Sequence, residues 1–150
     1  MKKPVKVQPR LLIKCVPGEV ILARELKLHS LSVLRENTVE YLPGSAVGVE
    51  RRNLNGTELW RHVRRQDDLP IYHRFFSLVR HFRYGFAVVF DHGWYFHIRP
   101  DGKAAYRWRF SDVTDVSSEG IALVQHPQRS GWHCFHVARN SFADGWTNKK

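Results

Sequence analysis

The feature that most constrains this chain is a short block of residues that occurs three times. The clearest copy is residues 85–89, Gly-Phe-Ala-Val-Val, and a second copy, Gly-Ile-Ala-Leu-Val, occupies residues 120–124. A fainter copy, Gly-Ser-Ala-Val, occupies residues 44–47. Repetition at such a period indicates a row of similar structural units rather than one irregular core.

A second block follows each copy in the same order. It starts at a glycine, contains aromatic residues and ends on a histidine next to a β-branched residue, as in residues 56–63, 93–98 and 131–137. We place the extra residues between the blocks in loops at 91–92 and 126–130. His62, His97 and His136 then share one repeat position, which favours a structural role for them over a unique catalytic one.

The composition of the blocks predicts strands. They are short, rich in β-branched and aromatic residues, and bounded by turn residues such as Pro100, Asp101 and Gly102. Residues 104–110 are expected to add a third strand. Each unit is therefore expected to be an antiparallel meander. Because such a small sheet is marginal alone, the units should bury their shared faces against one another.

These residues resemble the repeat unit of the bacterial WG-repeat proteins. That unit contains Gly-Leu-Ala-Val, a charged turn, Gly-Trp-Tyr-Phe-Ile and then Asp-x-x-Gly-Lys. The matching residues are 85–89, 93–98 and 101–103, and again 118–124 and 131–132. The resemblance covers residues 69–142, more faintly 39–68, and not 1–38. It implies a repeat-built interaction module and supplies no catalytic motif.

We therefore predict a mainly β fold, an open array of about three antiparallel β-meander units with an irregular or mixed N-terminal cap. Three units are too few to close a propeller. The cap is residues 1–38, and the repeats form one folded domain over 39–150, with units at about 39–68, 69–105 and 106–144. Residues 10–16 and 19–26 fit strands or a short helix, and residues 57–65 have a competing helical pattern.

Composition excludes several classes of protein. With 150 residues, of which 43% are hydrophobic, the chain can bury a core. It has no apolar stretch long enough to span a membrane. Its two cysteines, Cys15 and Cys134, make no disulfide framework, so we expect free buried thiols and a cytoplasmic location. The net charge is +10 and lies mostly in residues 1–65, which suggests an acidic partner.

The densest basic cluster supplies the candidate binding residues. Arginine binds phosphates and carboxylates through two parallel hydrogen bonds, and nearby aromatic rings add stacking. The alternative interpretation is a solvated, charged strand edge. The candidates for binding a nucleic acid or an acidic partner are Arg51, Arg52, Trp60, Arg61, Arg64, Arg65 and Arg74.

Other chemistry is poorly supported. His133, Cys134 and His136 suggest zinc, but strand alternation points the two histidines to opposite faces and no second pair stands at zinc-finger spacing. We therefore predict no metal and no cofactor. His73 with Arg74 and His97 would suit a small nuclease, yet no phosphate loop, nucleophile elbow or paired carboxylates accompany them.

The sequence therefore predicts a non-catalytic binding or scaffolding module that presents an Arg- and aromatic-rich β surface to a protein partner. The alternative is a basic RNA- or DNA-binding subunit of a nucleoprotein assembly, and the third hypothesis is a small His-dependent nuclease. We expect no membrane contact. Open sheet edges allow a homo-oligomer or a larger complex.

Overall fold

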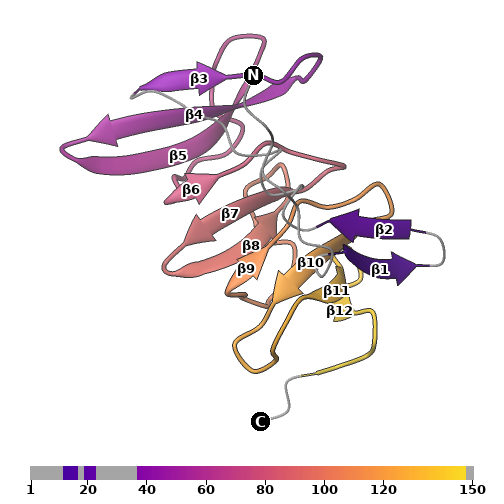
Figure 1. Cartoon of the computed structure of the whole chain (residues 1–150). Helices are drawn as coiled ribbons and strands as arrows, with labels where there is room; N and C mark the ends of the chain where they lie inside the picture. Colours follow the sequence, from indigo (N-terminus) through magenta and orange to yellow (C-terminus); the bar gives the residue numbers. More distant parts are fainter. Residues whose placement is uncertain (1–11, 17–18, 23–36, 148–150) are drawn as a thin grey trace, which may run out of the picture.

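The chain folds into strands joined by turns and irregular segments (Figure 1). The computed structural model describes residues 12–16, 19–22 and 37–147, which contain twelve strands and no helix. The predicted mainly β fold of antiparallel meanders is confirmed. None of the described segments is a helix with the length and apolar character that crossing a membrane requires.

The first unit is a sheet of three antiparallel strands in the order β3-β4-β5. Its strands are β3 (Thr38–Glu40), β4 (Val47–Leu54) and β5 (Thr57–Arg64). Asn55 and Gly56 both have positive φ, as the tight two-residue turn between β4 and β5 requires. Since β5 pairs with β4 along its whole length, the helical alternative for residues 57–65 is wrong.

The second and third units repeat this arrangement. The second unit consists of β6 (Leu78–Val79), β7 (Ala87–Asp91) and β8 (Trp94–Ile98). The third consists of β9 (Asp112–Val113), β10 (Ile121–Gln125), β11 (His133–His136) and β12 (Ser141–Phe142), in the order β12-β11-β10-β9. The predicted strand over residues 104–110 is wrong, because only Ala104 and Phe110 form isolated bridges there.

Part of the predicted N-terminal cap is a hairpin. β1 (Leu12–Val16) and β2 (Glu19–Leu22) pair as a separate antiparallel sheet. Strands are therefore the correct alternative for these residues. The remainder of the predicted cap, residues 1–11, 17–18 and 23–36, lies outside the described residues.

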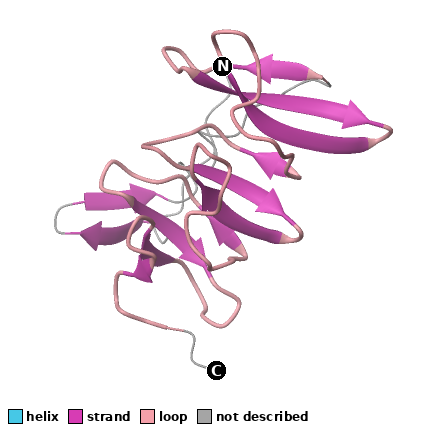
Figure 2. Ribbon diagram, turned by 180° about the vertical axis from the view of Figure 1, so that it is seen from behind, coloured by secondary structure: helices cyan, strands magenta, loops and turns pink. Residues whose placement is uncertain are grey.

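Equivalent backbone bridges join each unit to the next. Trp60 pairs with Phe76 between the first and second units, and Tyr95 pairs with Phe110 between the second and third. The three sheets consequently follow one another in a row (Figures 1 and 2). The β4–β5 and β7–β8 turns lie at one edge of this row. The segments 64–74 and 99–107, which lead from one unit to the next, form what we call the connector edge.

The core runs through the row of sheets. Phe110 packs edge-to-face on Tyr106 and on Phe135, so one aromatic cluster spans the junction of the second and third units. Such contacts bury area that a single meander cannot bury alone. The largest fully buried apolar side chains are those of Phe76, Phe110, Phe135, Ile98, Ile121, Leu123, Val63, Val88, Val89 and Val113.

Strand register identifies the equivalent positions of the units. His97 lies opposite Val88 in the second unit. Backbone hydrogen bonds to the preceding strand place Leu123 of the third unit where Val88 stands in the second, and Leu123 lies opposite Cys134. The prediction that His136 is the third equivalent histidine is therefore wrong by two residues. The longer β10–β11 loop shifts the register, so Cys134 takes the position.

Cys134 is not a free thiol. It is held in a disulfide, which contradicts the expectation of two free buried cysteines. The sequence contains one other cysteine, Cys15.

The first unit also differs from its expected alignment. Gly48, rather than Ala46, occupies the position of Ala87, because Gly48 lies opposite Val63 as Ala87 lies opposite Ile98. A methyl group at Gly48 would lie 2.5 Å from the Tyr41 ring. Glycine is required there because the tyrosine ring covers its α-carbon.

Candidate binding surface

A buried histidine fastens the first unit to the second. His62 is fully buried, with Nδ1 2.6 Å from the Tyr72 hydroxyl and Nε2 2.7 Å from the backbone carbonyl oxygen of Arg80. A carbonyl only accepts, so Nε2 carries the proton and Nδ1 accepts from the tyrosine. The same hydroxyl accepts the His62 backbone N–H at 3.1 Å. Each polar atom of this group is therefore satisfied.

The second unit is fastened to the third in the same way. His97 Nδ1 lies 2.5 Å from the Tyr106 hydroxyl, and His97 Nε2 lies 2.8 Å from the Thr114 carbonyl oxygen. Burial lowers the pKa of His62 to about 3 and that of His97 to about 4. Both rings are thus neutral at pH 7, with both nitrogens hydrogen-bonded. We call each arrangement a His–Tyr interlock.

The interlocks argue against a catalytic role for one of the histidines considered for a nuclease. His97, one of the three residues considered for a nuclease, is buried with both ring nitrogens occupied, whereas His73 is exposed at the surface. The zinc hypothesis also lacks a site, because no three of the described His, Cys, Asp and Glu side chains gather as metal ligands. His133 instead bonds the Ser130 carbonyl.

The predicted arginine cluster divides between the two faces of the β4–β5 hairpin. Residues opposite each other on paired strands share a face. Arg51 lies opposite Trp60, on the face that also carries Arg64, whereas Arg61 lies opposite Glu50 on the other face, next to Arg52. The structure therefore does not bring these arginines together as one patch.

Most of these arginines already have partners. Glu50 accepts from Arg61 at 2.5 Å and from Arg52 at 3.2 Å. Trp60 is buried. The remaining partners are Glu58 for Arg51, Asp67 for Arg64, Asp91 for Arg74, and the Ser45 and Leu42 carbonyls for Arg65. Much of the cluster's positive charge is therefore compensated within the chain.

Arginines also stack on phenylalanine rings at equivalent positions. Arg61 stacks on Phe75 with its guanidinium 4.5 Å from the ring centre, and Arg109 stacks on Phe96 at 3.8 Å. Phe96 directly precedes the interlocked His97, just as Arg61 directly precedes His62. Arg109 follows the interlocked Tyr106 by three residues, just as Phe75 follows Tyr72. The two units therefore make the same stack with its partners exchanged, which assigns these arginines to packing.

An open groove lies at the connector edge, where the first unit meets the second. Its volume is about 750 Å³. Ala46, Val47, Ile71 and Pro100 supply apolar lining, and Arg64, Arg65, Gln66 and Asp101 supply polar lining. An apolar lining that also contains a few polar groups is typical of binding sites.

Two tyrosines hold the backbone of segments that line this groove. The Tyr41 hydroxyl lies 2.6 Å from the Arg64 carbonyl oxygen and 2.5 Å from Asp68 Oδ1, and burial together with the Asp68 carboxylate raises the pKa of Tyr41 to about 12. Gly102, with φ +85°, packs against Tyr72 so closely that a Cβ would lie 2.8 Å from its side chain. The Pro-Asp-Gly turn seen in the sequence thus sets one wall of the groove.

Sequence reasoning found some of the surface and missed the rest. Arg64, Arg65 and Arg74 lie on the connector edge, whereas Arg51, Arg52, Trp60 and Arg61 belong to the β4–β5 hairpin. The residues Ile71, Pro100 and Asp101 were not among the predicted site residues. The sequence does indicate these residues, because the connectors are repeated segments that contain the turn and the buried tyrosines.

Comparison of the chain with protein-family models, curated proteins and solved structures finds no match. The WG-repeat resemblance therefore stays a prediction that rests on the residues quoted for it.

Proposed function

We propose that this chain is a non-catalytic binding module whose protein partner docks along the connector edge. The observation that carries the proposal is the groove of about 750 Å³ between two consecutive units, which is lined by both apolar and charged residues. Two connectors held by His–Tyr interlocks make a rigid support for a docked segment. Rigid, preorganised surfaces lose less entropy on binding.

Two alternatives receive less support. Nucleic-acid binding by the predicted arginine cluster relies on guanidinium groups that are free to meet phosphates, yet Arg61, Arg64 and Arg74 of that cluster are each paired with a carboxylate. Catalysis by a small nuclease relies on a histidine that exchanges protons, and the interlocked His97 is committed to two hydrogen bonds. A protein partner on the connector edge does not require a proton-exchanging histidine or these paired arginines.

A pulldown from nuclease-treated lysate tests the proposal. The wild-type chain is compared with Ala46→Trp, which fills the groove from an exposed position, and with Leu54→Trp at the β4–β5 turn as a matched control. We expect a protein that is retained after nuclease treatment, retained by Leu54→Trp and lost with Ala46→Trp.

The outcomes separate the hypotheses. Loss of every bound protein after nuclease treatment would support the nucleic-acid alternative instead. Retention of the partner by a folded Ala46→Trp variant would exclude the groove. Turnover of RNA or DNA that a single His73→Ala change abolishes would establish the nuclease hypothesis.

A further inference from the structure

The net charge of the repeats is concentrated at the connector edge. Residues 37–147 contain 14 basic and 11 acidic residues. The connectors, 64–74 and 99–107, contain six of these basic residues and only three of the acidic ones. The other residues of this range contain eight of each sign. The whole positive excess of the three units therefore lies on the surface that contains the groove.

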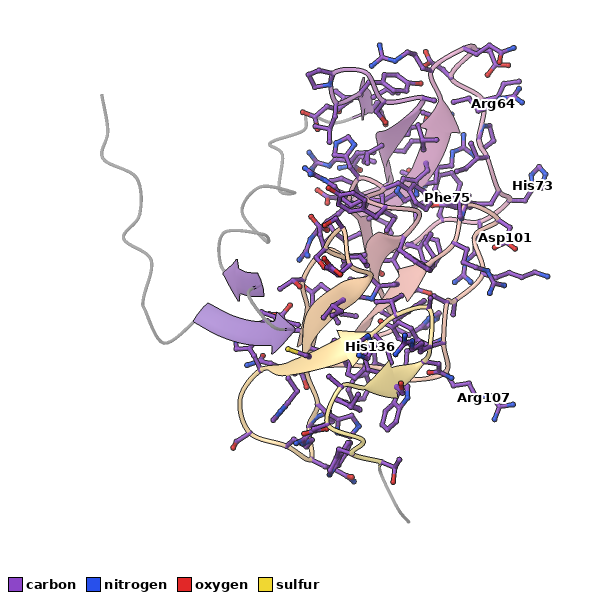
Figure 3. All side chains as sticks on the ribbon, turned by 90° about the vertical axis from the view of Figure 1, so that its right-hand side faces the viewer. Arg64, His73, Phe75, Asp101, Arg107 and His136 are labelled. Carbon is purple, nitrogen blue, oxygen red and sulfur yellow. The ribbon has the colours of Figure 1, made fainter. Side chains whose placement is uncertain are left out.

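Exposed basic side chains repeat from one connector to the next. Arg64 and Arg99 each lie two residues after an interlocked histidine, and their side chains are 47% and 49% exposed. His73 and Arg107 each follow an interlocked tyrosine and are exposed. Figure 3 shows Arg64, His73 and Arg107 along one edge, projecting away from the sheets.

Several arginine and lysine side chains of the connectors are available to a partner. Lys103 and Arg107 form no salt bridge with any residue in the described part of the chain, and Arg99 reaches Asp101 only at 3.9 Å. Exposed pairs of this kind contribute little to stability. Their positive charge is consequently free to interact across an interface.

We propose that the bound segment is an acidic peptide in which carboxylates alternate with apolar residues; this inference rests on the proposed function. Its apolar side chains enter the groove beside Ile71 and Pro100, and its carboxylates meet Arg99, Lys103 and Arg107. A polyphosphate chain suits this edge less well, because Asp67, Asp68 and Asp101 interrupt the cations and repel a uniform negative charge.

Fluorescence anisotropy with defined probes tests this assignment. The probes are a labelled peptide of alternating glutamate and leucine, the same peptide with lysine in place of glutamate, and a single-stranded oligonucleotide. The double variant Lys103→Gln and Arg107→Gln is compared with Arg52→Gln, which neutralises a half-exposed arginine away from the connectors. Thermal unfolding confirms that each variant is folded.

We expect the wild type to bind the glutamate peptide most tightly. The double variant should bind it roughly tenfold more weakly, and Arg52→Gln should bind like the wild type, because charges at an interface rim steer association. Added salt should weaken binding. Equal binding of the lysine peptide, tighter binding of the oligonucleotide, or an unaffected double variant would overturn the inference.

Failure of this inference is distinguishable from failure of the proposed function. If the pulldown recovers a protein that Ala46→Trp loses, but the glutamate peptide does not bind, the module binds proteins and the acidic assignment is wrong. If no protein is recovered and no peptide binds, both are wrong.

Discussion

The interlocked histidines make stability depend on pH. His62 and His97 have pKa values of about 3 and about 4 in the fold against an ordinary value of 6.5, so below pH 6.5 the unfolded chain binds more protons than the folded one. Stability is therefore fully present above pH 6.5 and falls as the pH drops toward 4. Chemical denaturation at pH 7, 5.5 and 4.5 measures this.

A matched pair of variants identifies the source of that dependence. His97→Gln should cost about 1–3 kcal/mol at pH 7, because the Thr114 carbonyl or the Tyr106 hydroxyl loses its partner. It should also flatten the decline in acid, whereas His73→Gln at an exposed position should do neither. Parallel curves for wild type and His97→Gln would contradict the interlock.

A buried aspartate acts with the opposite sign. Burial raises the pKa of Asp115 to about 6, although Arg80 and Arg83 oppose that shift, and its Oδ2 has no hydrogen-bond partner. The charged carboxylate therefore destabilises the fold at pH 7, and its protonation relieves this as the pH falls through 6.

Asp115→Asn should consequently raise the melting temperature at pH 7 by several degrees and have little effect at pH 4.5. The matched control is Asp112→Asn, three residues earlier in β9 and only half-buried. A drop in the melting temperature of Asp115→Asn at pH 7 would show that the nearby arginines, rather than burial, dominate the pKa of the Asp115 carboxyl group.

Residue identity at the repeat positions was only partly predictable. The recurrence of His62 and His97 is visible in the sequence, and it identifies two of the three equivalent repeat positions. Cys134 could not be found this way, because the longer β10–β11 loop moves the register by two residues without any change of pattern. Its disulfide removes the expectation of free thiols on which the predicted cytoplasmic location rested, and that location stays a prediction.

At the scale of elements, the hairpins were predictable and the irregular connectors were not. Residues 104–110 have strand-like composition, but an Arg109 nitrogen donates to the carbonyls of Tyr106, Arg107 and Trp108 at 2.9–3.3 Å. This guanidinium satisfies backbone groups that a strand partner would otherwise satisfy. Nothing in the alternation of residues reveals such a bond.

The exchanged Arg–Phe stacks give a prediction at the same scale. Arg61→Phe and Phe75→Arg should each destabilise the first unit, because each removes the stack between these side chains. The double variant recreates the order found in the second unit, so it should be more stable than the sum of the single effects by about 0.5–1 kcal/mol. A double-mutant cycle by chemical denaturation measures this coupling, and strict additivity would contradict it.

At the scale of the whole molecule, the distribution of the charge along the chain matters more than the total net charge. The sequence carries +10, but residues 37–147 carry only three of those charges, and the connectors account for all three. The arginines of the β4–β5 hairpin, which dominate the sequence pattern, are paired or stacked. Alternation predicts which face each occupies, but not which carboxylate meets it.

Hydroxyl-radical footprinting of the chain, free and bound to the recovered partner, tests the central claim most directly. The docking surface predicts that the partner protects side chains of residues 64–74 and 99–107 and leaves the β4–β5 and β7–β8 turns unchanged. Protection of those turns with full reactivity along the connector edge would contradict it.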